Sequence, residues 1–464
     1  MAEQFDVVVI GGGPGGYAAA LYGAAAGLRM AVVERDKVGG TCLHRGCIPA
    51  KQFLETATVF RTVAGAKDFG VVADQPSVEF ATSQARKQKV VDQLWKGLSG
   101  LMKSRKITTV HGTGTLADHR TVKVDDGTEL KATKAVILAS GSAPRTLPGF
   151  AVDGRFVLTS DEVLSLERLP VSAAVIGGGA IGCEFASMLS DLGTQVTILE
   201  GLPKILPGCD SDVADVVVRS FKRRGIDVRT GVKVEGHEPS GDQTTVRLGD
   251  GGTLTVDAVV MSIGRRPLAD TLGLDETTKV EVDERGFVKV DEHCRTAEDG
   301  VYAVGDLINT PQLAHVGFAE AIVVIKDILG EPALAVDYPK VPWCIYCFPE
   351  VAFAGLSEQA AREAGMDVVV SKHRFVANSR ALIVGEPDGL VKVIAEKGPD
   401  GTAGRLVGVH MVGPWVTEQL AEGYLSVNWE ATPDDISQYI HPHPTLSETF
   451  GETVMALTGR GLHG

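Results

Sequence analysis

The 464-residue sequence has few cysteines and no apolar run long enough to span a bilayer. Seven scattered cysteines cannot supply the disulfide framework of a secreted protein, so a reducing, cytoplasmic setting is expected. The first ten residues carry acidic side chains and run directly into a strand-like stretch, which predicts neither a secretory nor an organellar leader. A membrane is therefore not expected as a partner.

Basic residues are also fewer than acidic ones, with 45 Lys and Arg residues and 59 Asp and Glu residues. The resulting net charge of −14 repels phosphate backbones, so nucleic acid is not expected as a partner. The excess of acid is explained most simply as a contribution to solubility. A composition with 44% hydrophobic and 22% charged residues is ordinary for a folded soluble protein, and the length predicts two to four domains.

One supersecondary unit occurs twice in the chain. Residues 7–34 and 173–200 each contain an apolar strand, a glycine-rich turn, a helix of mostly small residues, and a second apolar strand that ends in glutamate. The glutamate follows the first glycine of the turn at the same spacing in both copies. β-patterned sequence follows each copy, with hairpin signals at Asp126-Gly127 and Asp250-Gly251-Gly252. Two sites of one kind are therefore expected.

The first glycine turn has the pattern of a dinucleotide-binding site. Gly11 permits the tight turn, Gly13 lets the backbone approach a pyrophosphate, and Gly16 lets the helix pack closely on the strand. The helix N-terminus then faces the phosphates. Glu34 ends the second strand, where a carboxylate can hold ribose hydroxyls.

The second turn repeats this pattern with Gly177, Gly179, Gly182 and Glu200. A carboxylate in the place of Glu200 accepts hydrogen bonds from a free 2′-hydroxyl and repels a 2′-phosphate, so NAD is favoured over NADP. Lys204 lies nearby and keeps NADP open as an alternative. Two dinucleotide sites in one chain indicate electron transfer between two different nucleotides.

A pair of cysteines, Cys42 and Cys47, follows the first unit in the segment GGTCLHRGCIPAK. A helix that starts near Cys42 would bring the two sulfurs together. A bridge across so short a loop would stabilise the fold by only about 2 kcal/mol. Thiol–disulfide exchange therefore explains the pair better than a structural disulfide does. His44 and Arg45, with a helix N-terminus, are expected to favour the thiolate. The alternative is two free buried cysteines that happen to be neighbours.

The segment HPHPTLSE, residues 441–448, holds a candidate proton acceptor. A histidine has the pKa range needed to take a thiol proton, and a carboxylate such as Glu448 would raise its basicity and fix its tautomer. Thr445 and Glu448 also match a capping box, which is the structural alternative for Glu448. The residues alone do not decide between His441 and His443.

With these segments, nearly the whole chain resembles the pyridine nucleotide–disulfide oxidoreductase family, and most of all its members that oxidise dihydrolipoyl groups. The matching segments are GGGPGG, GGTCLHRGCIPAK, GGGAIGCE, SIGRRP, VYAVGD, LAH, FVANSRAL and HPHPTLSE. The resemblance implies an α/β protein with two Rossmann-like domains, which bind FAD and NAD, and a C-terminal α+β dimerisation domain. We expect FAD-binding residues 1–149, NAD-binding residues 150–274, a second part of the FAD-binding domain in 275–340, and an interface domain in 341–464. Within that last domain, strands are expected at VAFAG, FVANSRALIV, LVKVIAE and LVGVHMVG, followed by a helix over 417–428.

The resemblance also assigns roles to single residues. Lys51 corresponds to the lysine near flavin N5, and Glu184 to the acid paired with it. Asp306 corresponds to the carboxylate at the ribityl–phosphate region, Ala314 to the residue beside the isoalloxazine, and Arg265 to a group close to NAD. The full set of cofactor-binding residues implied for FAD and NAD is Gly11, Gly13, Gly16, Glu34, Thr41, Lys51, Gly114, Asp306, Ala314, Gly177, Gly179, Ile181, Gly182, Glu184, Glu200, Val234, Gly264 and Arg265.

By the same resemblance, Cys42 exchanges with substrate, Cys47 faces the flavin, and His443, oriented by Glu448, is the base. His441 is expected to be structural. In the family this base comes from the partner subunit, which implies a homodimer. The implied substrate is a dihydrolipoyl group on a lipoyl-bearing acyltransferase or carrier protein of a 2-oxo acid dehydrogenase complex, and this chain is expected to carry no lipoyl domain of its own.

The chain departs from the family pattern in two places. His44-Arg45 replaces the Asn-Val pair common in the family, and Cys344 and Cys347 form an unusual pair in WCIYCFPE. Residues three apart on a strand point to opposite faces, and a single CxxC is half a zinc site, so neither a disulfide nor a metal is expected there. The cysteines expected to serve only in packing are Cys183, Cys209, Cys294, Cys344 and Cys347.

Two other functions fit the sequence less well. A reductase of a low-molecular-weight disulfide in the same family would usually be NADP-linked, which Glu200 disfavours. A non-catalytic interaction subunit that keeps FAD as a structural element would not need Cys42, Cys47, His443 and Glu448. Mercuric-ion reduction is disfavoured because the C-terminal GRGLHG has no cysteine pair, and transhydrogenation because such an enzyme lacks the paired cysteines.

Overall fold

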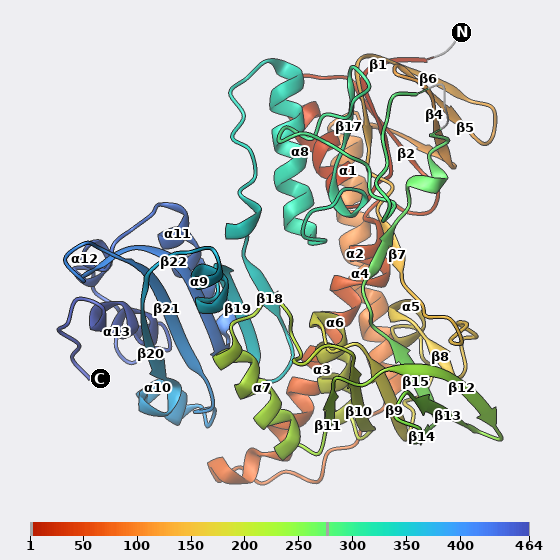
Figure 1. Ribbon diagram of the computed structural model, residues 1–464. Coiled ribbons are helices and arrows are strands. Elements are labelled where there is room, and N and C mark those ends of the chain that lie inside the picture. Colours follow the sequence, from red (N-terminus) through yellow and green to blue (C-terminus); the bar gives the residue numbers. More distant parts are fainter. Residues whose placement is uncertain (1–2, 275–277, 464) are drawn as a thin grey trace.

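In the computed structural model, which describes residues 3–274 and 278–463, two α/β units are followed by a C-terminal antiparallel sheet (Figure 1). This arrangement confirms the predicted fold class. The expected boundary between residues 274 and 275 adjoins residues 275–277, which lie outside the described part of the chain. None of the described helices is both long and apolar enough to cross a membrane.

The first unit contains a seven-stranded sheet in the order β3-β2-β1-β6-β5-β4, with β17 beside β6. Strands β3, β2, β1, β6 and β17 pair in parallel, whereas β4, β5 and β6 form antiparallel hairpins. The elements are β1 (Glu3–Ile10), α1 (Pro14–Ala25), β2 (Met30–Glu34), α2 (Gly40–Arg45), α3 (Cys47–Ala64), η1 (Ala66–Phe69), α4 (Phe80–Ser104), β3 (Thr108–His111), β4 (Gly114–Asp118), β5 (Thr121–Val124), β6 (Glu129–Leu138), β7 (Ser142–Pro144), β17 (Val301–Ala303), η3 (Gly305–Leu307) and α8 (Ala314–Leu329). Because β17 joins this sheet, the chain returns to the first unit after completing the second.

The second unit is a parallel five-stranded sheet in the order β11-β10-β9-β15-β8, with a separate three-stranded meander, β12-β13-β14. A short antiparallel pair, β16 with β7, links it to the first unit. The elements are β8 (Val157–Leu158), α5 (Ser160–Val163), β9 (Ser172–Ile176), α6 (Ala180–Asp191), β10 (Gln195–Glu200), α7 (Ser211–Arg223), β11 (Asp227–Thr230), β12 (Val234–Ser240), β13 (Gln243–Leu248), β14 (Thr253–Val256), β15 (Ala258–Met261), β16 (Arg265–Pro267) and η2 (Ala269–Thr271).

The C-terminal domain is an antiparallel sheet in the order β18-β19-β22-β21-β20, packed against helices. Its elements are η4 (Tyr338–Lys340), β18 (Trp343–Ile345), β19 (Glu350–Gly355), α9 (Glu358–Glu363), β20 (Val368–Arg374), η5 (Phe375–Ala377), α10 (Ser379–Ile383), β21 (Leu390–Lys397), β22 (Ala403–Gly413), α11 (Val416–Asn428), α12 (Pro433–Ser437) and α13 (Glu448–Ala456). Figure 1 shows this domain as the blue lobe beside the green α7 of the second unit.

The prediction of a strand at FVANSRALIV is wrong. Residues 375–384 form the short helices η5 and α10 instead, because the Asn378 side chain accepts a 3.0 Å hydrogen bond from the Ala381 amide and starts a helical turn. The strand lies just upstream, as β20, and pairs with β21 along its whole length. The other three expected strands and the helix over 417–428 are present as β19, β21, β22 and α11.

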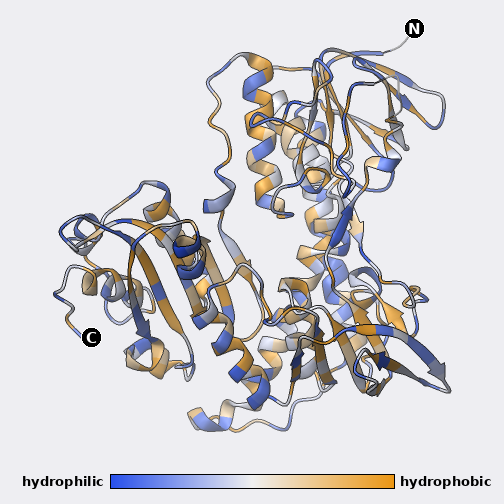
Figure 2. Ribbon diagram, viewed as in Figure 1, coloured by the Kyte–Doolittle hydropathy of each residue, from blue (hydrophilic) through white to orange (hydrophobic). Residues whose placement is uncertain are grey.

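Apolar strands are buried in the parallel sheets. In the parallel sheets both faces are covered, so continuous apolar runs such as Val7–Val9 in β1 and all of β15 are buried. In Figure 2, α8, which packs against α1, is mostly in the hydrophobic colour, whereas the tip of the β12–β13 hairpin is hydrophilic. A lysine, Lys392, is nevertheless fully buried in the apolar strand β21.

Candidate functional site

The first glycine turn is shaped by close backbone approaches. Gly11 has φ 105°, and a Cβ there would lie 2.2 Å from the Ala139 carbonyl oxygen; a Cβ at Gly16 would lie 1.8 Å from the Gly11 oxygen. Gly13, by contrast, faces open space, with nothing within 4 Å of a built Cβ. The backbone at Gly13 and the N-terminus of the 12-residue α1 thus leave room for a phosphate beside exposed amide groups.

Glu34 supports this turn from the end of β2. Its carboxylate accepts hydrogen bonds from the amides of Gly12, at 2.7 Å, and Asp36, at 2.9 Å. A carboxylate fixed in this way, half-buried beside the turn, fits the adenosine ribose of a dinucleotide. Gly114, at the start of β4, packs against Val33 of β2.

A pocket of about 300 Å³ runs from this turn to the cysteine pair. It brings together residues that lie far apart in the sequence. The predicted site residues that line it are Gly11, Gly13, Glu34, Thr41, Cys42, Cys47, Lys51, Gly114, Ile181, Glu184, Arg265, Asp306 and Ala314. Ala314 is the first residue of α8, so a second helix N-terminus faces the same pocket. The shape and the donors fit a dinucleotide that extends from the glycine turn to the thiols.

The cysteines lie on two consecutive helices rather than on one. Helix α2 begins at Gly40 and is interrupted at Gly46, so Cys47 is the first residue of the 18-residue α3. Both thiols are free, and they share a hydrogen bond. This arrangement places the Cys47 sulfur at a helix N-terminus, where negative charge is stabilised.

The two thiols have opposite pKa shifts. The pKa of Cys47 is lowered to about 7, chiefly because the Cys42 thiol hydrogen-bonds to its sulfur, and Lys51 contributes in the same direction. The pKa of Cys42 is raised, because its proton is held in that hydrogen bond and because it is buried. Of the reduced pair, Cys47 is therefore the more acidic thiol.

His44 and Arg45 each bond to a group other than the thiols. His44 Nε2 bonds to the Val38 carbonyl oxygen at 3.0 Å, and the ring packs edge-on against Trp95. Arg45 pairs with Asp36 at 2.8 Å on the surface. Arg45 also lines the pocket that contains the thiols, and the cation that lowers the Cys47 pKa is Lys51.

Lys51 and Glu184 form an ion pair at the pocket wall. Lys51 Nζ lies 2.9 Å from both carboxylate oxygens of Glu184. Burial alone would lower the pKa of Lys51, but Glu184 raises it, so the lysine keeps its charge. The Tyr346 amide donates to Glu184 at 2.9 Å, and the Tyr346 ring lies 4.9 Å from Lys51 Nζ. The C-terminal domain thus holds this pair in place, a contribution that the sequence motifs did not reveal.

Arg265 lines the pocket and bonds to residues of the first unit. Its guanidinium donates to Ser142 Oγ at 2.7 Å, and Ser142 in turn donates to Asp306 at 2.5 Å. The β16–β7 pairing carries Arg265 across to the first unit. Arg265 therefore contacts Asp306 of the first unit, and it lines the same pocket as Ile181 and Glu184 of α6, so its predicted place close to NAD stays a prediction.

The second glycine turn matches the first in detail. Gly177 also has φ 105°, and a Cβ at Gly182 would lie 1.9 Å from the Gly177 oxygen. Gly179 again faces open space. Glu200 accepts from the amides of Gly178, at 2.5 Å, and Leu202, at 2.7 Å. The same cradle for a dinucleotide is therefore present. Ile181 lies on the first turn of α6, Val234 begins β12, and Gly264 lies just before β16.

His443 and Glu448 meet in the C-terminal domain. His443 Nδ1 lies 2.8 Å from Glu448, and the His443 side chain is 72% exposed. Burial opposes the charge on Glu448, but the Thr445 amide and His443 hold its pKa below the usual range. Thr445 does not cap α13; its hydroxyl bonds to Pro442 and Ser447, so the expected capping box is only half formed.

His443 does not line the pocket that contains the cysteines, and α13 lies at the outer end of the C-terminal domain, away from α2 (Figure 1). One chain alone therefore does not bring His443 to Cys42. His441 has a different environment: it bonds to Glu422 at 2.8 Å and packs over Gly451, where any side chain would collide with its ring.

The remaining cysteines are free and mostly buried. Cys344 lies on β18 and Cys347 in the loop beyond it, so the two are not on one strand as expected. Cys347 is in the core shared with the second unit, whereas Cys344 packs on the C-terminal core and also reaches the pocket. Among the described residues, no group of three or more His, Cys, Asp and Glu side chains could hold a metal ion.

Comparison with known proteins agrees with this geometry. Residues 5–321 match the family model of the pyridine nucleotide-disulphide oxidoreductases, and residues 341–454 match the dimerisation domain of that family. The chain is 42% identical over its full length to a dihydrolipoyl dehydrogenase of Bacillus subtilis, which is also covered in full. It is 38% identical to dihydrolipoyl dehydrogenase 2 of Haloarcula marismortui, covering 99% of this chain and 98% of that protein.

Two solved structures are also similar. LpdA from Mycobacterium tuberculosis superimposes with a TM-score of 0.91 at 25% identity, covering 98% of this chain and all of that one. The HOCl-induced flavoprotein disulfide reductase RclA from Escherichia coli has a TM-score of 0.86 at 27% identity, covering 97% of this chain and 99% of that one.

Proposed function

This chain belongs to the pyridine nucleotide-disulphide oxidoreductase family, and from that premise we propose that it is a dihydrolipoyl dehydrogenase. Its substrate is a dihydrolipoyl group on an acyltransferase or carrier protein of a 2-oxo acid dehydrogenase complex. FAD occupies the pocket at the first glycine turn, and NAD⁺ binds at the second. The working unit is a homodimer formed through the C-terminal domain.

The observation that carries this proposal is the setting of the thiols. Cys47 begins α3, takes a hydrogen bond from Cys42, and lies in one pocket with the Lys51–Glu184 pair and the first glycine turn. A low-pKa thiolate beside a second thiol is the arrangement used in thiol–disulfide exchange. Two buried structural cysteines would need neither a lowered pKa nor an adjacent cation.

Cys42, Cys47 and His443 have different roles in dithiol oxidation. In the oxidised enzyme Cys42 and Cys47 are joined as a disulfide, and His443 of the partner subunit takes a proton from the substrate dithiol. The substrate thiolate attacks the Cys42 sulfur, and Cys47 leaves as a thiolate stabilised by Lys51 and the α3 N-terminus. The second substrate thiol then displaces Cys42, which releases the cyclic disulfide and leaves both enzyme cysteines reduced.

The two nucleotides supply the remaining redox chemistry. FAD held at the first glycine turn would supply the two-electron redox chemistry that returns Cys42 and Cys47 to their disulfide, with NAD⁺ as the final hydride acceptor. Lys51, which is paired with Glu184, keeps its charge beside the thiols, and Glu200 selects a nucleotide with a free 2′-hydroxyl. Asp306, Ser142 and Arg265 form a charged end of the FAD pocket.

The similarity to RclA supports a second candidate, a nicotinamide nucleotide-dependent reductase of a small disulfide. A third candidate is a subunit that keeps FAD for structure alone. Steady-state assays of the purified dimer distinguish them. A dihydrolipoyl dehydrogenase forms NADH from dihydrolipoamide, with little activity with NADP⁺. Faster oxidation of NADH by a low-molecular-weight disulfide would favour the second candidate, and no turnover in either assay would favour the third.

A further inference from the structure

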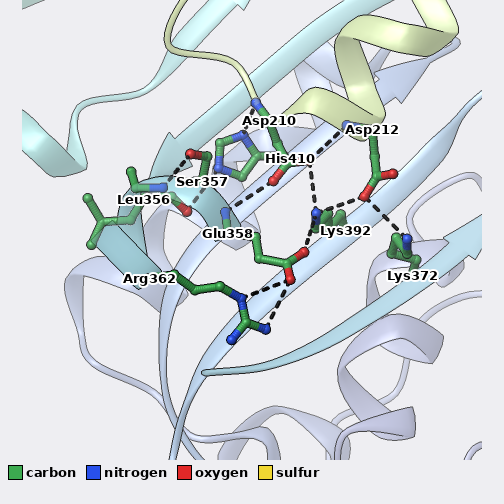
Figure 3. Close-up of polar contacts among 10 residues, drawn as sticks. Asp210, Asp212, Leu356, Ser357, Glu358, Arg362, Lys372, Lys392 and His410 are labelled. Carbon is green, nitrogen blue, oxygen red and sulfur yellow. Dashed lines mark hydrogen bonds and ion pairs between the residues drawn. The ribbon is translucent and has the colours of Figure 1, made fainter. Parts of the chain in front are cut away.

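A charged cluster lies between the C-terminal domain and the second nucleotide-binding unit (Figure 3). Its centre is Lys392 of β21, whose side chain is only 2% exposed. The Lys392 ammonium lies 2.9 Å from Asp210 and 2.8 Å from both Asp212 and Glu358. Lys372 pairs with Asp212 at 3.2 Å from the solvent side.

Two members of this cluster, Asp210 and Asp212, belong to the second nucleotide-binding unit, and Asp210 directly precedes α7. It caps α7 by accepting from the Asp212 amide at 3.0 Å, and it also accepts from the Glu358 amide at 3.1 Å. Its own amide donates to His410 Nδ1 at 3.4 Å, while His410 Nε2 donates to the Leu356 carbonyl oxygen at 3.0 Å. His410 is neutral in this arrangement, and burial lowers its pKa to about 4. Asp210 is thus held by three residues of the C-terminal domain, Lys392, Glu358 and His410.

The segment that ends at Asp210 begins at Glu200. Glu200 accepts from the Leu202 amide, and the Leu206 amide donates to the Gly178 carbonyl oxygen at 2.8 Å. Ile205 packs against Gly178, where a Cβ would lie 2.6 Å from the Ile205 side chain. Residues 201–209 therefore form one wall of the second glycine turn, and Asp210 is their fixed end.

We propose that Lys392 is a positioning residue for the nicotinamide nucleotide: by holding Asp210 from the C-terminal domain, it keeps residues 201–209 against the second glycine turn. This inference rests on the proposed role of that turn in binding NAD⁺. Without the lysine, the Asp210 carboxylate, which is only 2% exposed, would have no cation beside it, whereas Glu358 is 32% exposed and keeps its ion pair with Arg362. Unpaired buried charge is strongly unfavourable, so Asp210 would move toward water and draw the segment with it.

The test is the affinity of the FAD-loaded dimer for NAD⁺, measured by isothermal titration calorimetry. Lys392→Met keeps the unbranched, apolar stem of the side chain and removes its ammonium group. We expect its dissociation constant for NAD⁺ to rise about tenfold, the size expected for a residue that acts through its neighbours. In steady-state assays the KM for NAD⁺ should rise in parallel while kcat at saturating NAD⁺ stays within about twofold.

Lys372→Met is the matched control, because Lys372 contacts Asp212 but not Asp210 and is 48% exposed. Its affinity for NAD⁺ should equal that of the wild type. Asp210→Asn provides a second test, since asparagine retains the helix cap but weakens the attachment to Lys392. It should weaken NAD⁺ binding by about threefold, less than Lys392→Met does, and it decides the matter if Lys392→Met does not fold.

A folded Lys392→Met dimer that binds NAD⁺ as tightly as the wild type would overturn the role of Lys392 and leave the proposed function standing. Equal losses of kcat and of NAD⁺ affinity would also overturn it, since they would indicate general damage. If the wild-type protein itself does not bind NAD⁺, the assignment of the second nucleotide site fails, and the inference fails with it.

Discussion

The two nucleotide-binding units are alike up to the glutamate that ends their second strand, and they differ in the segment after that glutamate. Both turns have a first glycine at φ 105°, an open third position, and a carboxylate bonded to the amide of the middle glycine. After Glu34 the chain enters α2 and α3, which carry the thiols. After Glu200 it enters a segment tied to the C-terminal domain through Asp210 and Lys392. The shared unit makes a nucleotide site, and the next segment of the chain determines what that site does.

The largest expected effect concerns the segment that only the first unit has. Cys47→Ser removes the leaving thiolate, so dithiol oxidation should fall by about a thousandfold or more, as for loss of a covalent catalyst. FAD content, measured from the visible absorbance, should stay unchanged because the glycine turn is intact. Cys344→Ala, at the same pocket, is the control and should retain full activity. Substantial dithiol oxidation by Cys47→Ser would contradict the redox role of the thiols that distinguish the first nucleotide-binding unit from the second.

A smaller loss is expected for the base that completes the first site. His443→Gln should slow dihydrolipoamide oxidation by about a hundredfold, the usual contribution of a general base. Oxidation of NADH by an artificial electron acceptor bypasses the dithiol step and should stay within about twofold of the wild type. If both activities fall equally, His443 is not the base for the dithiol.

The third effect contrasts the two glutamates. Glu200→Arg should shift the preference between NAD⁺ and NADP⁺ by about tenfold toward NADP⁺, because a cation replaces the carboxylate at the 2′-position. Glu34→Arg should instead reduce FAD content and leave nucleotide preference unaltered in the protein that retains FAD. The ratio of kcat/KM values and the flavin absorbance provide the two measurements. Unchanged selectivity in Glu200→Arg would contradict the assignment of the second site.

The smallest effect concerns the thiol pKa. Because the pKa of Cys47 is lowered to about 7, the thiolate of the reduced protein should be present above that pH and lost as the pH falls through it. The ultraviolet absorbance of the thiolate follows this titration. Lys51→Met should move the midpoint upward, whereas Arg45→Gln should leave it unchanged. A shift in Arg45→Gln would restore the role expected for that residue from the sequence.

The sequence was sufficient for features that depend on local pattern. The repeated glycine turns, the hairpins and the parallel α/β class follow from spacing and apolar runs, and the structure has them. The strand predicted at residues 375–384 lies upstream, as β20. Asn378 can either continue an extended chain or cap a helix, and its hydrogen bond with the Ala381 amide shows that it caps one.

Long-range partners account for the features that the sequence could not show. His44 and Arg45 are close to the thiols in sequence, but the partners of their side chains are Val38 and Trp95 for His44 and Asp36 for Arg45. Tyr346 reaches Lys51 from the C-terminal domain. Lys392 did leave a signal, a single cation in the apolar strand LVKVIAE, but its three carboxylate partners come from two distant segments.

An anaerobic titration of the purified protein with dihydrolipoamide, followed by NAD⁺, tests the central claim most directly. We expect a flavin spectrum that gains a long-wavelength thiolate-to-flavin band as dithiol is added and reverts as NADH forms. If NADH produces this band and dihydrolipoamide does not, the thiols are redox-active but the dithiol substrate is wrong. If neither reductant produces it, Cys42 and Cys47 do not exchange electrons with a flavin, and the proposed difference between the two units is contradicted.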